Sequence, residues 1–393
     1  MGFFSGRVTC ARFRVAGKAP RLFGPDHLEQ LTAHAMGKQR VAAADGSVAG
    51  WTAGDHILDT RFDLAKNIIN DTLHFALRVD SQKLPGDLLR AYTQVELDAL
   101  AAKNPSGRPS ARQKREARES ARARIEAEAA DGRYLRRKAY PLLWDAQSNE
   151  LLVGSTAVTV LDRLHTLFQQ TFNRGFEMLG AGKQAFQQAE TRNQGRGVDD
   201  ATPAAFVPGL GQSEVVSWAP DEASRDFLGN EFLLWLWFVL DNESDTLELA
   251  DKSEVTAMFM RSLVLECPRG QTGKESITSD GPTRLPEAHR AIQAGKLPRK
   301  AGLVLVRHDQ QYELTLQAET LAISGAKLPP PEAEDDRAQL EERVTQVRHL
   351  LETLDLLYDA FGHRRCGPNW PKELARMQKW LQREERPRVS ATA

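Results

Sequence analysis

The sequence has few of the features that mark secreted, membrane-spanning or disulfide-stabilised proteins. Its 393 residues contain only three cysteines, Cys10, Cys267 and Cys366, an odd number without paired spacing, which favours a reducing cytoplasm over a disulfide scaffold. The first residues lack the long apolar core of a secretion signal. The strongest apolar run, residues 232–240, is much shorter than the roughly 20 residues of a membrane span. We therefore expect no membrane association, and a buried helix at this run.

Catalytic and metal-binding motifs are also missing. Residues 270–275 imitate a phosphate loop, but Pro268 takes the place of the first glycine and Glu275 the place of the metal-binding hydroxyl. Residues 180–184 fail the same pattern. We expect a protein that is not an enzyme and has no catalytic residue, metal or cofactor. The isolated candidates for metal ligands have no further ligand nearby in the sequence: His363 with Cys366, Asp241 with Glu243, and Asp251 with Glu254.

The overall charge gives no reason to expect a nucleic-acid partner. The chain has a net charge of −1 and a pI near 6.8, with the 41% hydrophobic and 27% charged residues of a soluble globular protein. Its length allows two or three cores at about 150 residues per domain. Between residues 103 and 138, however, twelve basic residues stand against five acidic ones, an excess of seven positive charges. The positive charge is localised in this segment.

The basic segment follows a predicted strand. Residues 73–79 alternate with a period of two, which predicts a strand with one buried face. Residues 83–86 break the strand, and we expect Asp87 to cap a helix that reaches residue 100. From residue 105 to 130 the apolar stripe almost vanishes. The second helix is therefore expected to bury little.

Two interpretations of this arginine-rich helix are open. Arg115 with Glu119, and Arg122 with Glu126, are four residues apart and predict ordinary pairs on a solvated helix face. Alternatively, arginines that recur every three or four residues form a stripe able to follow phosphates: Arg112, Arg115, Arg118 and Arg122.

The rest of the chain has the pattern of an α+β protein with antiparallel or mixed sheets, because its strands are not separated by regular helical crossovers. Residues 180–220 are expected to form a long surface connection, and residues 270–281 a polar turn. Strands are predicted at 8–13, 51–58, 140–144, 151–153, 247–249, 256–265, 303–307 and 312–316, and helices at 26–35, 160–168, 227–240 and 286–294.

A C-terminal helical extension is expected after three prolines at 329–331. Apolar residues at spacings of three and four from Leu340 to Phe361 predict a helix that docks on the body, in preference to pairing with a second copy of itself. A last amphipathic helix is predicted at 371–382. The chain is thus divided into an N-terminal α+β region with the basic helical arm at about 86–138 (1–145), a second α+β region (146–328) and the helical extension (329–393).

Several stretches, in this order, resemble the recombination-associated RdgC family. The matches cover roughly residues 1–170 and 285–328, and their order carries the resemblance. They are Phe3-Phe4-Ser5-Gly6-Arg7-Val8, Gly50-Trp51, the strand ending near Lys83-Leu84-Pro85, the charged arm, Arg133-Tyr134, Leu143-Trp144-Asp145, Glu150-Leu151-Leu152-Val153-Gly154-Ser155, and Ile292-Gln293-Ala294-Gly295-Lys296 followed by Lys300, Leu303, Leu305, Tyr312, Leu314 and Leu321.

The resemblance implies a cytoplasmic, nucleoid-associated homodimer that binds double-stranded DNA without sequence preference and restrains the RecA recombinase by competing for DNA. In the family, a two-fold ring places basic side chains of both protomers around a central hole. Lys83, Arg133 and Lys296 match basic positions of the family pattern, and Tyr134 stands at an aromatic position connected with closing the ring. The expected DNA-binding residues are Lys83, Arg112, Lys114, Arg115, Arg118, Arg122, Arg133, Arg136, Arg137, Lys138, Lys296 and Lys300.

A function of another class remains open. The chain departs from the family in residues 180–240 and in its extended C-terminal helices. The alternative is a non-enzymatic interaction scaffold whose basic arm contacts an acidic protein partner.

Overall fold

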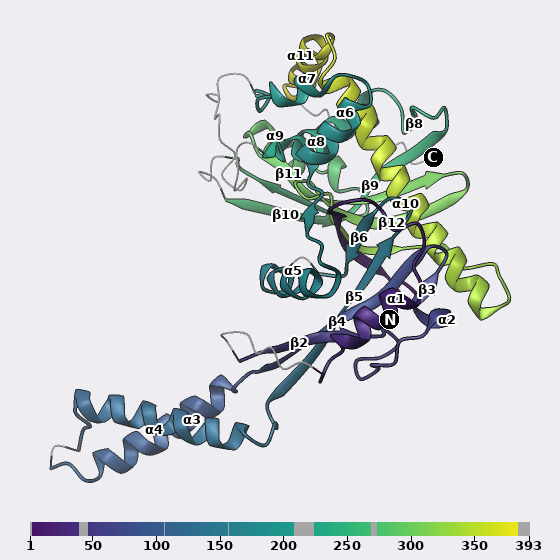
Figure 1. Ribbon diagram of the computed structural model, residues 1–393. Coiled ribbons are helices and arrows are strands. Elements are labelled where there is room, and N and C mark those ends of the chain that lie inside the picture. The colour runs from purple at the N-terminus through teal and green to yellow at the C-terminus, as the bar shows by residue number, and fades with distance from the viewer. Residues whose placement is uncertain are drawn as a thin grey trace.

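The computed structural model describes residues 2–38, 46–105, 107–155, 157–207, 224–268 and 273–383. Within these ranges, eleven α-helices and one antiparallel sheet of thirteen strands confirm the α+β class (Figure 1). The strands are β1 (Val8–Val15), β2 (Val48–Thr52), β3 (Ile68–Ile69), β4 (Thr72–Gln82), β5 (Leu135–Asp145), β6 (Glu150–Val153), β7 (Phe176–Met178), β8 (Thr246–Glu248), β9 (Glu254–Glu266), β10 (Lys274–Ser279), β11 (Leu297–Arg307), β12 (Gln310–Gln317) and β13 (Ile323–Lys327). The helices are α1 (Pro25–Ala33), α2 (Leu64–Asn67), α3 (Gly86–Ala101), α4 (Ala111–Ala129), α5 (Val158–Phe172), α6 (Ala181–Glu190), α7 (Gly195–Asp199), α8 (Phe227–Asn242), α9 (Pro286–Gln293), α10 (Asp336–Arg365) and α11 (Trp370–Leu381).

The first strand joins two halves of the sheet. The main strand order is β10-β9-β11-β12-β13-β1-β6-β5-β4-β2. The start of β1 pairs with β13 at Val8 and Cys10, whereas residues 11–14 pair with β6. One strand therefore links a half that ends at β2 to a half that ends at β10.

Each half has its own hydrophobic core. The first core gathers Trp51, Phe75 and Trp144 from the sheet under α5. The second surrounds α8, which is buried along most of its length, and also takes side chains from β11 and α10. Residues 146–178 belong to the first half, and β5 and β6 form one hairpin across the predicted boundary at residue 145. The cores thus divide the chain differently from the predicted regions.

Most predicted elements are present. The apolar run of residues 232–240 lies in the buried helix α8. The predicted strand pairs at 140–153 and 303–316 are the antiparallel hairpins β5–β6 and β11–β12. The helix predicted from residue 340 is α10, and Val347, Leu354 and Phe361 are buried within the chain. This confirms that the stripe docks on the body, and leaves it unavailable for pairing with a second copy.

Five predictions of local structure were wrong. The strand predicted at residues 51–58 is β2 (Val48–Thr52), and residues 53–58 form no strand. Residues 181–199 form α6 and α7 instead of a surface connection, and residues 274–279 form β10. β4 is buried on both faces from Thr72 to Asp80, and on the face that was expected to be exposed the N-terminal Phe4 packs edge-on against His74, with ring centres 4.5 Å apart. Asp87 does not cap α3, whose N-cap is Pro85. The remainder of the predicted connection, residues 208–220, lies outside the described ranges.

Candidate nucleic-acid interface

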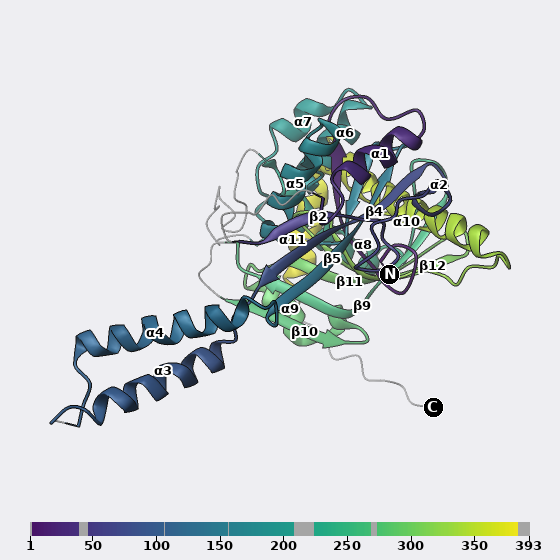
Figure 2. The same cartoon turned by 60° about the horizontal axis from the view of Figure 1, so that its bottom comes forward.

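The basic segment forms a helical arm that projects from the sheet (Figures 1 and 2). β4 and β5 pair from Thr72 opposite Asp145 to Gln82 opposite Leu135. Their far ends pass beyond β6, which pairs only with residues 142–145 of β5. The chain between them folds back on itself as α3 and α4, which are about 24 and 29 Å long at 1.5 Å per residue. A two-stranded ribbon thus carries a two-helix hairpin.

The arm is held together by a stripe of mostly small residues on α4. The stripe recurs every four residues, so it lies on one side of the helix. Small side chains allow two helices to approach closely, so this stripe is the packing face of the arm. The partner helix α3 has no buried residue of its own. The prediction that this helix buries little therefore missed its packing face, because alanine barely registers as an apolar stripe. The buried residues are Ala117, Ala121, Ile125 and Ala129.

A cluster around Glu128 fixes the base of the arm. The Tyr92 hydroxyl donates to Oε1 of Glu128 at 2.7 Å, and the Tyr134 hydroxyl donates to Oε2 at 3.3 Å. The guanidinium of Arg124 lies 4.1 Å from the centre of the Tyr92 ring. The bond from Tyr92 lowers the pKa of Glu128 and raises the pKa of Tyr92. α3, α4 and the chain leading into β5 therefore meet at one carboxylate.

Several arginines of α4 are paired with glutamates on the same helix. The predicted pairs Arg115–Glu119 and Arg122–Glu126 are confirmed, at 3.8 and 2.8 Å. Exposed pairs of this kind are screened by water and salt and contribute little to stability, so a phosphate can replace the glutamate. Two further pairs have the same spacing: Arg112–Glu116 at 2.7 Å and Arg124–Glu128 at 3.6 Å.

Three cations form a row along one side of α4. Lys114, Arg118 and Arg122 follow one another at intervals of four residues, and all are exposed. Among the described residues, no acidic group pairs with Lys114 or Arg118. With 3.6 residues per turn, Arg115 lies about 60° and Arg112 about 120° round the helix from Arg118. On the same scale Lys114 and Arg122 lie about 40° to either side of Arg118, and Arg115 lies about 20° beyond Arg122, so Arg112 alone turns away from this side of the helix. We call Lys114, Arg118 and Arg122, which recur every four residues, the basic row.

The positive excess comes mainly from the two ends of the arm. α4 has six basic and four acidic residues, and α3 has one basic and three acidic residues. The remaining positive charge lies at the tip, with Lys103 and Arg108, and at the base, with Arg133 and residues 136–138. The structure thus spreads the charge along the whole arm instead of concentrating it on one helix.

Three basic residues lie on β5 at the base of the arm. Side chains alternate along a strand, so Arg136 and Lys138 share one face and Arg137 lies on the other. Arg137 is 3.7 Å from Asp80, which already accepts two hydrogen bonds from Arg78. Within the described ranges, Arg136 and Lys138 have no acidic partner, and both are exposed. We call residues 135–139 the base strand.

Three residues singled out by the family resemblance also meet at the base of the arm. Lys83 is exposed, and its backbone N–H donates to the carbonyl of Tyr134 at 3.2 Å. Arg133 is exposed and pairs with Asp131 at 2.6 Å. The Tyr134 side chain is half-buried against Glu128. The ribbon brings Lys83 and Arg133, which are far apart in the sequence, to the same place.

The two remaining predicted DNA contacts lie elsewhere. Lys296 and Lys300 are at the start of β11, which β12, β13, β1 and β6 separate from β5 in the strand order. Lys296 is only 7% exposed and pairs with Glu275, so its ammonium group does not face a DNA backbone. Lys300 is exposed. We therefore leave Lys296 out of the interface.

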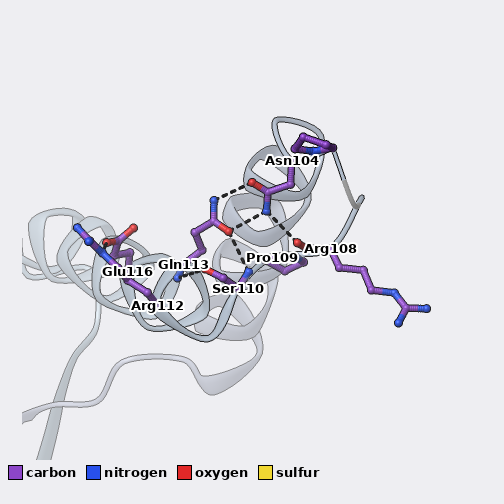
Figure 3. A pocket seen from close by; sticks show the side chains of 8 residues that line it. Asn104, Arg108, Pro109, Ser110, Arg112, Gln113 and Glu116 are labelled. Carbon is purple, nitrogen blue, oxygen red and sulfur yellow. Dashed lines mark hydrogen bonds and ion pairs between the residues drawn. The ribbon is translucent and has the colours of Figure 1, made fainter.

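The tip of the arm carries a groove that the sequence did not indicate (Figure 3). Its volume is about 880 Å³, and it is open to solvent. The side-chain amides of Asn104 and Gln113 bond to each other, at 2.8 and 3.1 Å. Ser110 caps α4 by accepting from the Gln113 N–H, and the Gln113 side chain accepts from the Ser110 N–H. These bonds fix the turn between the helices, and Figure 3 shows Arg108 pointing away from them.

No protein-family model matches the chain, and no curated protein matches it.

In the stretch 180–184, which imitates a phosphate loop, a carboxylate of the protein itself occupies the place of a phosphate. Gly182 lies in the first turn of α6, and its N–H donates to Oδ1 of Asp226 at 3.0 Å. A carboxylate thus covers this helix start, where a phosphate would need free N–H groups. In the part of the chain that the structure describes, no three His, Cys, Asp or Glu side chains are grouped to hold a metal ion. No described helix is both long and apolar enough to cross a bilayer.

Proposed function

We propose that the protein binds double-stranded DNA without sequence preference through the basic row, the tip of the arm and the base strand. One observation carries the proposal: exposed cations of a nearly neutral chain gather on a projecting element, where six of them have no acidic partner among the described residues. These six are Lys83, Lys103, Lys114, Arg118, Arg136 and Lys138. Neutralising phosphates gives affinity for any sequence and needs no catalytic group.

The dimensions of the basic row suit a DNA backbone. From Lys114 to Arg122 the helix rises about 12 Å at 1.5 Å per residue. A single DNA strand places one phosphate about every 3.4 Å along the duplex axis, so the row spans three to four phosphates. The flexible side chains adjust to the remaining mismatch, which is the behaviour expected of a binder that does not read bases.

The resemblance to the RdgC family extends this proposal. It adds a homodimeric ring, association with the nucleoid in the cytoplasm, and competition with the RecA recombinase for DNA. Because the stripe of α10 is buried within the chain, the proposed dimer rests on the resemblance alone. Light scattering at micromolar concentration should give twice the chain mass of 43.8 kDa, and a mass of one chain throughout would contradict the dimer.

A charge-matched pair of variants tests the DNA interface. The first replaces Lys114, Arg118 and Arg122 with glutamine. The control removes three exposed lysines far from the arm in the sequence, at positions 18, 372 and 379, so both variants lose the same charge. Gel shifts with unrelated duplexes at several salt concentrations measure affinity and its salt dependence.

Each phosphate contact contributes about 0.9 to the slope of log affinity against log salt. The row variant should bind every duplex more weakly, with a slope flatter by about 2–3 units, whereas the control should keep most of the wild-type slope. Equal losses in both variants would mean that only net charge matters. No loss in the row variant would remove the basic row from the interface.

A further inference from the structure

The base strand has an open edge. Because Lys83 N–H donates to Tyr134 C=O, residues 83 and 134 form a hydrogen-bonded pair, and such pairs alternate along an antiparallel ladder. The odd-numbered residues from 135 to 141 of β5 therefore turn their backbone groups away from β4. On that side, the last bond to the neighbouring segment joins Gly154 N–H to Pro141 C=O at 2.9 Å. From residue 140 back to residue 135, this edge of β5 has no neighbouring strand among the described residues, whereas the other edge remains paired with β4.

Two residues present complete sets of backbone groups at this edge. Arg137 and Ala139 are exposed, and among the described residues nothing bonds to their outward N–H and C=O groups. Leu135 adds its carbonyl, since its N–H already donates to Gly132 C=O. An unpaired strand edge of this kind can take up an extended chain as an additional strand.

The charges on the base strand select the occupant. A second copy of β5 in antiparallel pairing would place Arg136, Arg137 and Lys138 opposite like charges, which is destabilising. An extended segment rich in Asp and Glu would place opposite charges across the same pairs. Charge complementarity therefore favours an acidic strand over a self-pairing one.

We propose that the edge of β5 from Leu135 to Ala139 binds an extended acidic segment of a partner protein as an added strand. This activity goes beyond DNA binding, because it uses backbone groups that phosphate contacts do not require. It also involves Arg136 and Lys138, which belong to the proposed DNA interface. An acidic segment on the edge therefore displaces DNA from the base of the arm.

Cations on an edge strand have another known role. They keep sheets from pairing edge to edge, and in that case no partner is needed. The two roles differ in one respect: strand addition requires backbone hydrogen bonds, whereas a protective charge does not. The test therefore changes the backbone and keeps the charge.

A pair of peptides provides the first arm of the test. The probe is a fluorescein-labelled hexapeptide in which glutamate alternates with valine, and its matched control carries an N-methyl group on every peptide nitrogen. Both have the same charge, but the methylated peptide has no peptide N–H to donate from either edge of its strand. In fluorescence anisotropy, we expect the wild-type protein to bind the probe at least tenfold more tightly than the control.

The substitution Ala139→Pro provides the second arm. It removes one outward N–H, keeps every charge and leaves the bonds to β4 in place, since residue 139 turns its backbone outward. Pro141 already occupies the next equivalent position of this edge. The variant should bind the probe at least tenfold more weakly than the wild type.

Two results would overturn the proposal: equal binding of both peptides by the wild type, or equal binding of the probe by the wild type and a folded A139P protein. If A139P does not fold, the two peptides on the wild-type protein decide the question. The outcome is independent of the proposed function, because a protein that binds the probe but no duplex contradicts DNA binding and keeps the open edge as a peptide site.

Discussion

At the level of single residues, two glycines in buried helices predict opposite effects of the same substitution. A Cβ on Gly229 in α8 would lie 1.8 Å from the backbone carbonyl oxygen of Ala318, so part of the core must shift. A Cβ on Gly362 in α10 has a side-chain nitrogen of Arg192 at 3.9 Å as its nearest outside neighbour.

We expect Gly229→Ala to lower the free energy of unfolding by about 1–3 kcal/mol or more, as overpacking does. Gly362→Ala should raise it by about 0.5–1 kcal/mol, because alanine loses less backbone entropy in a helix. Urea denaturation of the two variants measures both effects. Changes of the same sign would contradict the close contact between α8 and the segment that follows β12.

His74 predicts a specific dependence of stability on pH. Burial of the ring lowers its pKa from the ordinary histidine value of 6.5 to about 3. Below pH 6.5 the unfolded chain binds a proton that the folded chain excludes, so this contribution to stability is complete above pH 6.5 and is lost as the pH falls towards 3.

Between pH 6.5 and 5, wild-type protein should lose up to about 1.4 kcal/mol per pH unit more than a His74→Leu variant, which corresponds to one proton. Urea denaturation at several pH values measures the difference, and groups common to both proteins cancel. Parallel stability curves would show that His74 is protonated in the folded protein.

At the level of elements, the arm is expected to be dispensable for folding. In the strand register of the ribbon, Lys83 and Tyr134 form a hydrogen-bonded pair. Replacing residues 84–133 with Asn-Gly therefore leaves a β-hairpin with a two-residue turn of the favoured type. α3 has no buried residue, and α4 buries only the stripe from Ala117 to Ala129 that holds the arm together. The excised protein should keep a cooperative thermal transition within a few degrees of the wild type. Loss of that transition would mean that the arm supports the body.

The sequence was most informative where one element dominates its surroundings. The long apolar run predicted the buried helix α8, and the two predicted strand pairs are the hairpins β5–β6 and β11–β12, because large-scale burial and short connections leave a signal in the local sequence. The missed elements depend on partners distant in the sequence. α6 begins at Gly180-Ala181-Gly182, which resembles a loop until Asp226 bonds to its first turn, and β10 is recognisable only beside β9.

Only the local features of the candidate site were predicted, because contacts between residues distant in the sequence leave no pattern in it. The i, i+4 pairs of α4 are local and were found correctly, at Arg115–Glu119 and Arg122–Glu126. The placement of Lys83 beside Tyr134 depends on strand register across the whole arm, and the pairing of Lys296 with Glu275 depends on β10, which β9 separates from β11 in the sheet. Neither relation has a signal in a single sequence.

At the level of the whole molecule, the protein combines a basic arm with an acidic remainder: residues 103–138 carry an excess of seven positive charges, which leaves a net charge of −8 on the rest of the chain. A net charge of −1 gives little long-range attraction to DNA, so binding depends on the position of the cations and not on their sum. An arm that extends from the body offers its cations to a duplex without bringing the acidic residues of the body close to the phosphates. Removal of the arm should therefore abolish binding more completely than the loss of any three charges.

The central claim is tested most directly by the salt dependence of duplex binding for the wild type and for the protein with residues 84–133 excised. The wild type should bind two unrelated duplexes equally, with log affinity falling steeply and linearly with log salt. The excised protein should bind both at least 100-fold more weakly at the same salt concentration, with a slope flatter by several units. If the folded, excised protein keeps the wild-type affinity and slope, the arm is not the DNA-binding element of this protein.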